Sequence, residues 1–220
     1  MFRTAFALSI TMAMASSISA ATMSYVAPIL PVNGSGVTGM ASFSLIDMTS
    51  LTVHILASGL EPNQIHPAHL HGKVGPGGIL LPPAPPEDLD GDGYIETPEA
   101  ELAVGPPIIP LGEFLVPVSG ILDVQRVYDL TDPATFGGGP IPTGFQPFEF
   151  MTFELHGMTV PQGAGLGTPH EVNGTGGYKM MLPVGSGQPT PVPEAATSSL
   201  LAAGAALLAV QLHRARRSKS

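Results

Sequence analysis

Residues 88–99 read Asp-Leu-Asp-Gly-Asp-Gly-Tyr-Ile-Glu-Thr-Pro-Glu and match the twelve-residue calcium-binding loop at every ligand position. The candidate ligands at positions 1, 3, 5, 7, 9 and 12 are Asp88, Asp90, Asp92, Tyr94, Glu96 and Glu99. Tyr94 would offer its backbone carbonyl, and Gly93 fills position 6, where the loop turns sharply. Because close carboxylates repel one another unless a cation neutralises them, the spacing predicts a Ca²⁺ site. The alternative is a solvated acidic loop.

Histidines form a second set of candidate ligands. His69 and His71 alternate along the segment 65–72, so in an extended strand both point to one side, close enough to share a metal ion. His156 ends another extended segment and could complete a three-histidine site for copper or zinc. The alternative is a pair of hydrogen-bonded polar residues at a strand end, without metal. Three further histidines are interpreted as surface, packing or loop residues: His54, His66 and His170.

The sequence shows no catalytic set beside these ligands. It contains no nucleophile elbow, no phosphate-binding loop and no zinc-protease helix. Its carboxylates concentrate in the predicted calcium loop, where a cation would occupy them, which makes them poor acid–base catalysts. We therefore predict no catalytic residues and no organic cofactor, and favour a non-enzymatic protein while an enzyme stays open.

The elements that must position these ligands are predicted strands. Apolar and polar residues alternate, and glycine and proline punctuate nearly every junction. Strands are expected over 41–46, 51–58, 112–118, 148–156 and 178–184. In the fourth of these, Phe148, Phe150, Glu154 and His156 are expected to share one face. Residues 22–187 are predicted to form one all-β domain, an antiparallel β-sandwich or barrel with long loops.

The calcium loop is predicted to lie in an insertion, residues 82–107. Prolines between residues 82 and 86 exclude an entering helix. After the loop, Thr97 is expected to cap a short helix that has Pro98 in its first position and continues over 99–102. A calcium loop flanked by one helix has no second helix-loop-helix unit whose position could change when calcium binds. We therefore interpret the site as a structural clip or a low-affinity extracellular site. A second long loop, 132–146, is expected to be exposed.

Both ends of the chain are predicted to direct export. Residues 1–21 combine Arg3, a short apolar stretch and closing small residues, which is typical of a secretory signal peptide. Residues 188–220 begin as a Gly- and Pro-rich linker and continue as an apolar segment, 195–212, followed by an arginine cluster. That segment is just long enough to span a bilayer as a helix, with its basic end in the cytoplasm.

The charge of the domain between these ends excludes one class of partner. Its basic residues are Lys73, Arg126 and Lys179, against 16 acidic residues, which gives a net charge of −13. Such a domain repels nucleic acid and attracts cations. The chain has no cysteine, so a packed core, and a metal ion where one binds, must stabilise it without disulfides.

Residues 39–72 resemble the CHRD domain, in which a strand ends in a His-x-His pair followed by glycine. The match is carried by Ala41-Ser42-Phe43, Leu51-Thr52-Val53, Ser58-Gly59-Leu60 and Ala68-His69-Leu70-His71-Gly72. The chain is also similar to copper/zinc superoxide dismutase, a Greek-key β-sandwich with a comparable His-x-His strand. In that family another copper ligand ends a strand shortly before a glycine-rich tail, and Leu155-His156 falls in a comparable place. The resemblance implies a Greek-key β-sandwich and His69, His71 and His156 as copper or zinc ligands.

Two departures limit what the resemblance implies. The dismutase family needs a bridging histidine, further zinc ligands and a disulfide, whereas this chain has no histidine between His71 and His156 and no cysteine. At most a mononuclear site could remain.

Residues 192–220 resemble the PEP-CTERM sorting signal, with Val192-Pro193-Glu194-Ala195 at the Pro-Glu-Pro element. That resemblance implies processing by an exosortase in a Gram-negative bacterium; the alternative is an ordinary membrane anchor.

These observations lead to two functional hypotheses. The first is an exported, calcium-binding CHRD-like domain of the cell surface or biofilm matrix, without enzymatic activity. The second is a copper-dependent redox enzyme similar to superoxide dismutase, with the three histidines as ligands. A carbohydrate- or protein-binding module of the matrix is a third possibility, although the chain has no Trp for stacking on sugars.

Overall fold

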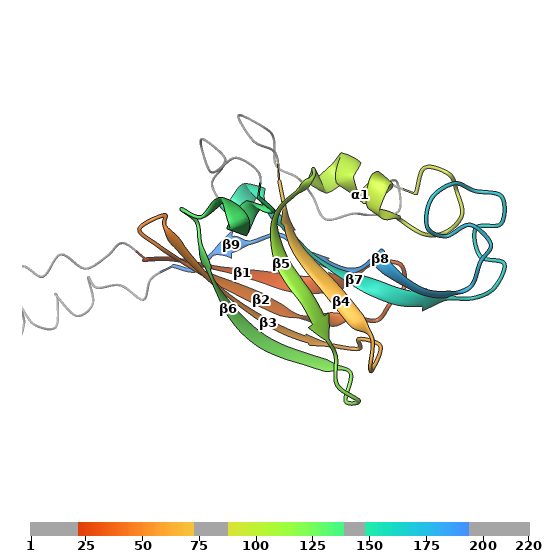
Figure 1. Cartoon of the computed structure of the whole chain (residues 1–220), viewed down its shortest axis with the longest axis horizontal. Helices are drawn as coiled ribbons and strands as arrows, with labels where there is room; N and C mark the ends of the chain where they lie inside the picture. Colours follow the sequence, from red (N-terminus) through yellow and green to blue (C-terminus); the bar gives the residue numbers. More distant parts are fainter. Residues whose placement is uncertain (1–21, 73–87, 139–147, 194–220) are drawn as a thin grey trace, which may run out of the picture.

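Nine strands form in the residues that the computed structural model describes, which are 22–72, 88–138 and 148–193 (Figure 1). Their bounds are β1 Thr22–Pro31, β2 Thr38–Ile46, β3 Ser50–Ser58, β4 Ile65–His71, β5 Pro107–Leu115, β6 Ile121–Asp129, β7 Thr152–Val160, β8 Gly177–Gly187 and β9 Thr190–Pro191. All paired strands are antiparallel. The all-β fold class predicted from the sequence is confirmed.

The strands follow the order β5-β4-β7-β8-β1-β2-β3-β6, with β9 paired to β1. β1, β2 and β3 form a meander, β4 and β5 belong to the other half of the sheet, and β6 returns to pair with β3 along its whole length. β1 joins the two halves, because Leu30 and Pro31 at its end pair with β8.

Alternating side chains of both halves meet in one apolar core. Fully buried members include Phe43, Leu45, Leu51 and Ile55 from one half, and Leu70, Ile109, Phe153 and Leu155 from the other. A Phe148 ring lies 5.1 Å from both Tyr25 and Phe43. Because apolar residues on the inner face fill the core, the polar residues that alternate with them lie on the opposite face of each strand.

Two local predictions are wrong. Phe148 and Phe150 do not continue the β7 strand but form a 3₁₀ turn, η3 (Phe148–Phe150), because Phe148 turns inward onto the aromatic core. The helix α1 spans Thr97–Val104, and Glu96, not Thr97, is its N-cap residue. The Thr97 hydroxyl instead donates to the carbonyl of Met181 in β8, 2.7 Å away, which fastens the start of the helix to the sheet.

α1 covers the outer face of the half that contains β4, β7 and β8 (Figure 1). Of the predicted exposed loop 132–146, the described part forms a 3₁₀ turn, η2 (Pro133–Phe136), whose residues are not buried. The predicted signal peptide and the apolar segment after residue 193 lie outside the described residues, as do residues 82–87 of the insertion. Within the described residues no helix has the length and apolarity needed to cross a membrane.

Candidate metal centres

The strand register brings the three predicted histidine ligands together. Leu70 of β4 pairs with Phe153 of β7, and both side chains are 0% exposed in the core. Side chains alternate along a strand, so the neighbours His69 and His71 project from the opposite face, and His156 of β7 projects beside them. Each of the three histidines offers one ring nitrogen within 4.8 Å of the other two.

This distance fits a single shared ion. Two metal–nitrogen bonds of about 2.0–2.1 Å placed end to end span roughly 4 Å, so a small inward movement of the rings would complete coordination. The ring centroids of His69 and His156 are 5.0 Å apart, and those of His69 and His71 are 5.8 Å apart. His71 and His156 are almost completely buried, and His69 is partly exposed.

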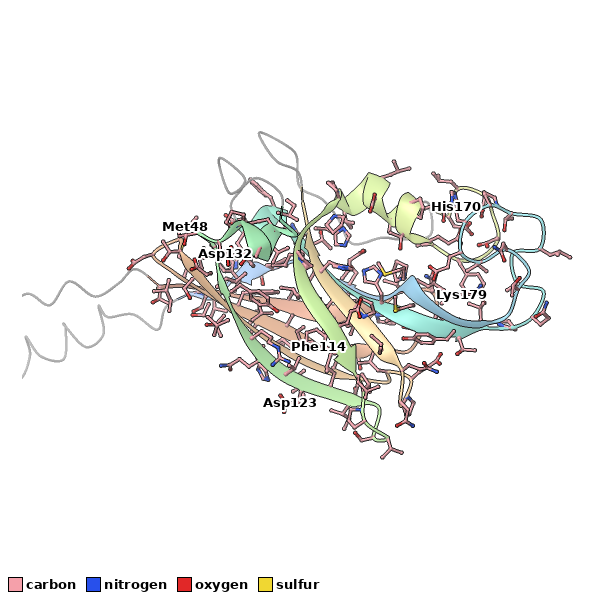
Figure 2. The ribbon with its side chains drawn as sticks, in the orientation of Figure 1. Met48, Phe114, Asp123, Asp132, His170 and Lys179 are labelled. Carbon is pink, nitrogen blue, oxygen red and sulfur yellow. The ribbon has the colours of Figure 1, made fainter. Side chains whose placement is uncertain are left out.

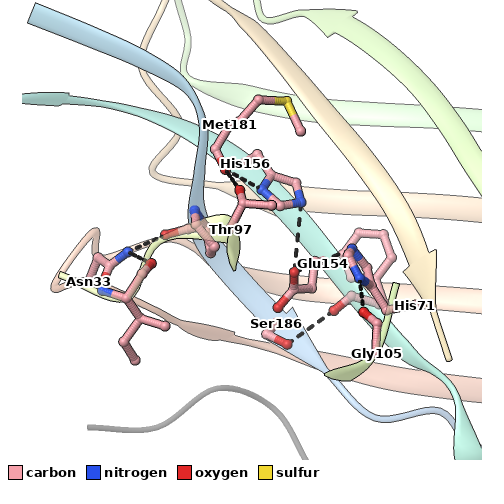
Figure 3. A network of polar contacts seen from close by, with 11 residues as sticks. Asn33, His71, Thr97, Gly105, Glu154, His156, Met181 and Ser186 are labelled. Atoms are coloured by element: carbon pink, nitrogen blue, oxygen red, sulfur yellow. Dashed lines mark hydrogen bonds and ion pairs between the residues drawn. The ribbon is translucent and has the colours of Figure 1, made fainter. Parts of the chain in front are cut away.

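Backbone carbonyls fix the orientation of two of these rings (Figure 3). Nδ1 of His71 lies 2.9 Å from the carbonyl of Gly105, and Nδ1 of His156 lies 2.8 Å from that of Met181. A carbonyl only accepts, so Nδ1 carries the proton and donates in both rings. Each Nε2 is left with a lone pair, which is the arrangement that second-shell partners of metal-bound histidines impose.

The nitrogens that face the centre have nothing else to bind. Nδ1 of His69 and Nε2 of His71 and His156 are buried and have no hydrogen-bond partner within the described residues. Burial lowers the pKa of His71 to about 4 and that of His156 to about 3, and it also lowers the pKa of His69. All three imidazoles are therefore neutral at pH 7 and able to bind a metal.

One acidic residue, Glu154, lies beside the histidine cluster. It was not among the ligands predicted from the sequence. Glu154 is 0% exposed, and its Oε2 lies 3.4 Å from Nε2 of His71 and 3.8 Å from Nε2 of His156. Burial is the main cause that raises the pKa of Glu154 to about 8, so without a bound cation the protonated acid is favoured at pH 7. The signal in the sequence was its place two residues before His156, on the same face of β7.

A glycine allows the chain to pass close to His156. Gly157 has a φ of +108°, and a Cβ there would lie 2.0 Å from the hydroxyl oxygen of Tyr178 and 2.9 Å from Nδ1 of His66. His66 is fully buried, and its two ring nitrogens lie 2.9 Å from the carbonyl of His156 and 3.0 Å from that of Glu61. It is therefore a packing residue, as the sequence suggested, and it supports the backbone of a candidate ligand.

The predicted calcium loop folds with its carboxylates converging. Two groups of three have oxygens within 4.8 Å of one another, and they share Asp90: Asp88, Asp90 and Glu99, and Asp90, Asp92 and Glu96. Asp88 accepts hydrogen bonds from the backbone nitrogens of Gly91, Asp92 and Gly93, and Asp92 accepts one from Tyr94. The loop is therefore wound around its own acidic side chains.

Two of these carboxylates are out of the solvent. Glu96 is 0% exposed and Glu99 is 3% exposed, and the Oε2 of Glu96 has no hydrogen-bond partner within the described residues. Burial raises the pKa of Glu96, and burial also raises that of Asp92, to which Asp90 and Asp88 add repulsion. Buried acidic groups without a counter-ion are costly. A bound cation would remove that cost, whereas a solvated loop without a cation would leave it in place.

The side chain of Asn33 anchors the calcium loop through hydrogen bonds. Its side-chain amide donates to the carbonyls of Ile95 and Pro183, both at 2.9 Å, and its Oδ1 accepts from the backbone nitrogen of Ile95 at 2.7 Å. Both backbone groups of Ile95, at position 8 of the loop, are thus satisfied from one side chain. Tyr94 at position 7 packs its ring beside Val160, Val172 and Leu182.

The loop between β7 and β8 closes the other side of the calcium loop. Val172 donates its backbone N–H to Glu96, and the Thr168 hydroxyl lies 3.5 Å from the Oδ2 of Asp92.

His170, labelled in Figure 2, is an exposed residue of the loop between β7 and β8 and belongs to neither candidate site. His54 is partly exposed and pairs with Asp123 at 2.8 Å. Both placements agree with the sequence interpretation of these residues.

Comparison of the chain with protein-family models and with curated proteins found no match. What the two sites do must therefore be argued from their own geometry.

Proposed function

We propose that this protein is a metal-binding β-sandwich domain that holds one copper or zinc ion at His69, His71 and His156 and is stabilised by Ca²⁺ at the loop 88–99. The observation that carries the proposal is the convergence of three neutral imidazoles, each with a buried nitrogen that has no protein partner. Leaving such polar atoms buried and unpaired is unfavourable, and an ion that accepts their lone pairs offsets this cost.

The calcium loop supports the domain structurally in this proposal. It has no entering helix within the described residues and is clamped by Asn33 and Val172, so it has little freedom to move as a sensor loop does. Glu99 reaches back to the backbone nitrogens of Leu89 and Glu96 and closes the loop onto the first turn of α1. The bound cation would therefore hold the loop and α1 against the sheet.

The cellular setting belongs to the same proposal. The predicted signal peptide and the similarity of residues 192–220 to a PEP-CTERM signal support export and processing by an exosortase, with location at the cell surface or in the matrix of a Gram-negative bacterium. The resemblance to the CHRD domain and to superoxide dismutase belongs to this proposal and rests on the His-x-His strand and on His156. The acidic surface and the export signals both argue against nucleic acid as a partner.

A titration of the purified full chain with Zn²⁺ and with Cu²⁺ tests the proposed function. We expect one ion per chain at saturation, and loss of that ion in His71→Ala. His54→Ala is the matched control, because His54 is a partly exposed histidine outside the cluster. Equal stoichiometry and affinity in wild type and His71→Ala would contradict the proposal.

The partial exposure of His69 favours a second candidate function, a copper-dependent redox enzyme. A catalytic metal needs a position open to a small substrate, and within the described residues His69 is partly exposed whereas His71 and His156 are buried. Copper-loaded wild type would then accelerate superoxide dismutation above the rate seen with the metal-free protein, and His71→Ala would not. A copper-loaded chain without this activity leaves binding as the function.

A further inference from the structure

We infer that Glu154 is a fourth ligand of the histidine site, so that three imidazoles and one carboxylate hold a divalent ion. The inference rests on the proposed function, because it concerns the ion of the same site. It goes beyond it by naming a ligand that the His-x-His pattern does not contain and by defining which ions the site prefers.

The strand register places Glu154 beside the cluster, next to His71 and His156. It pairs directly with His69 across β4 and β7, and side chains of directly opposed residues are neighbours on one face of a sheet. It also lies two residues before His156 on the same strand, so both project to the same side. Its Oε2 comes within 3.4 Å of the free nitrogen of His71.

Nothing else in the surroundings explains this carboxylate. Both of its oxygens are buried without a hydrogen-bond partner within the described residues, and separations of 3.4 and 3.8 Å from the two Nε2 atoms are too long for hydrogen bonds. A buried carboxylate is normally paired, hydrogen-bonded or bound to a metal. The two nearby rings already donate through Nδ1 to carbonyls, which leaves metal coordination as the role that satisfies all the free atoms together.

A carboxylate in the ligand set changes the choice of metal. Three imidazoles with one oxygen suit Zn²⁺ or Cu²⁺, whereas Cu⁺ prefers soft sulfur ligands. The negative charge also cancels one of the two charges of the ion inside a buried site. Four protein ligands fill a tetrahedral shell, which is typical of sites that bind a metal without an open position for a substrate.

Zn²⁺ affinity of the full-length variant Glu154→Gln tests the inference. We expect it to fall by more than about tenfold, the lower end of what removal of even a second-shell partner costs. Glu113→Gln is the matched control, because Glu113 acts electrostatically on His69 from an exposed position and its change removes the same charge. Its affinity should stay within about twofold of wild type, since exposed charges are screened.

Two readouts separate the outcomes. Unfolding of the metal-free protein by denaturant should show Glu154→Gln to be at least as stable as wild type, because an unpartnered buried acid is lost. Cu²⁺-loaded wild type should keep its absorption and electron paramagnetic resonance spectra when azide is added, because the fourth position is filled.

Unchanged Zn²⁺ affinity in Glu154→Gln, or azide binding to the wild-type copper ion, would overturn the inference while leaving the proposed function intact. A wild-type chain that binds neither ion would remove both. If Glu154→Gln fails to fold, the azide experiment on wild type still decides the question.

Discussion

At the scale of single residues, the orientation of the candidate metal ligands in the histidine cluster is fixed by groups that are not themselves candidate ligands. Two carbonyls, those of Gly105 and Met181, set the protonated nitrogen of His71 and His156. His66 supports the backbone of His156 from behind. Such partners fix ring orientation and contribute to affinity, so substitutions behind a ligand should weaken binding as well as substitutions of the ligand itself.

Gly157→Ala provides a residue-scale test of this support. Its Cβ would overlap the Tyr178 hydroxyl and push against His66, both of which lie behind His156. We expect a loss of about 1–3 kcal/mol of stability from overpacking, beyond the cost of the positive φ, together with weaker Zn²⁺ binding. Gly163→Ala is the control, because Gly163 also has a positive φ, +90°, but its Cβ would meet nothing within 4 Å. Equal losses in both variants, measured by denaturant unfolding, would argue against the close approach as the cause.

At the scale of elements, α1 connects the two candidate metal centres. It begins at the calcium loop and contains the last predicted Ca²⁺ ligand, Glu99, and it ends at Gly105, whose carbonyl orients His71. At its start, Thr97 donates to the same Met181 carbonyl that orients His156 (Figure 3). The position of one short helix therefore affects two of the three histidine ligands.

Calcium should consequently strengthen binding at the histidine site. In calcium-free buffer we expect the Zn²⁺ affinity to fall by about tenfold, in the range that loss of second-shell partners gives. By thermodynamic linkage, Zn²⁺ should raise the Ca²⁺ affinity by the same factor. Asp88→Asn, which removes the negative charge of the first loop ligand and so weakens Ca²⁺ binding, should show the low Zn²⁺ affinity with and without calcium. Zn²⁺ affinity independent of calcium in the wild type would show that α1 does not couple the sites.

The elements also show how far the sequence could be interpreted. Period-two alternation located β2 and β3, and the spacing of acids and histidines located both clusters. β1 was not predicted, since its two faces both carry apolar residues such as Tyr25 and Val26, which hides the alternation. The role of Glu154 depends on the pairing of β4 with β7, and the role of Asn33 on a contact with Ile95 that is 62 residues away in sequence. Neither pairing leaves a local pattern.

At the scale of the whole molecule, the net charge is consistent with the candidate metal sites and with the predicted export signals. The domain without its predicted end segments has a net charge of −13 and no cysteine, so it lacks disulfides and repels itself electrostatically. Five carboxylates gathered in one loop concentrate that repulsion. A cation bound there would relieve it, and exported domains meet calcium at concentrations that suit low-affinity sites.

The melting temperature should therefore depend on calcium. At a concentration 100 times the dissociation constant, Ca²⁺ binding to the folded state adds about 2.7 kcal/mol, which corresponds to roughly 5–10 °C for a domain of this size. Mg²⁺ at the same ionic strength controls for general screening and should give a smaller shift. Glu99→Gln should lose most of the calcium effect, whereas Glu101→Gln, two residues further along α1, should keep it. A calcium shift no larger than that of Mg²⁺ would contradict a specific site.

The most direct test of the central claim, that the three histidines hold a resident transition metal, is elemental analysis of the full chain purified without chelators. We predict one equivalent of zinc or copper in addition to calcium, and calcium alone in His71→Ala purified in the same way. Wild-type protein that contains calcium but neither zinc nor copper, even after exposure to both ions, would contradict the account.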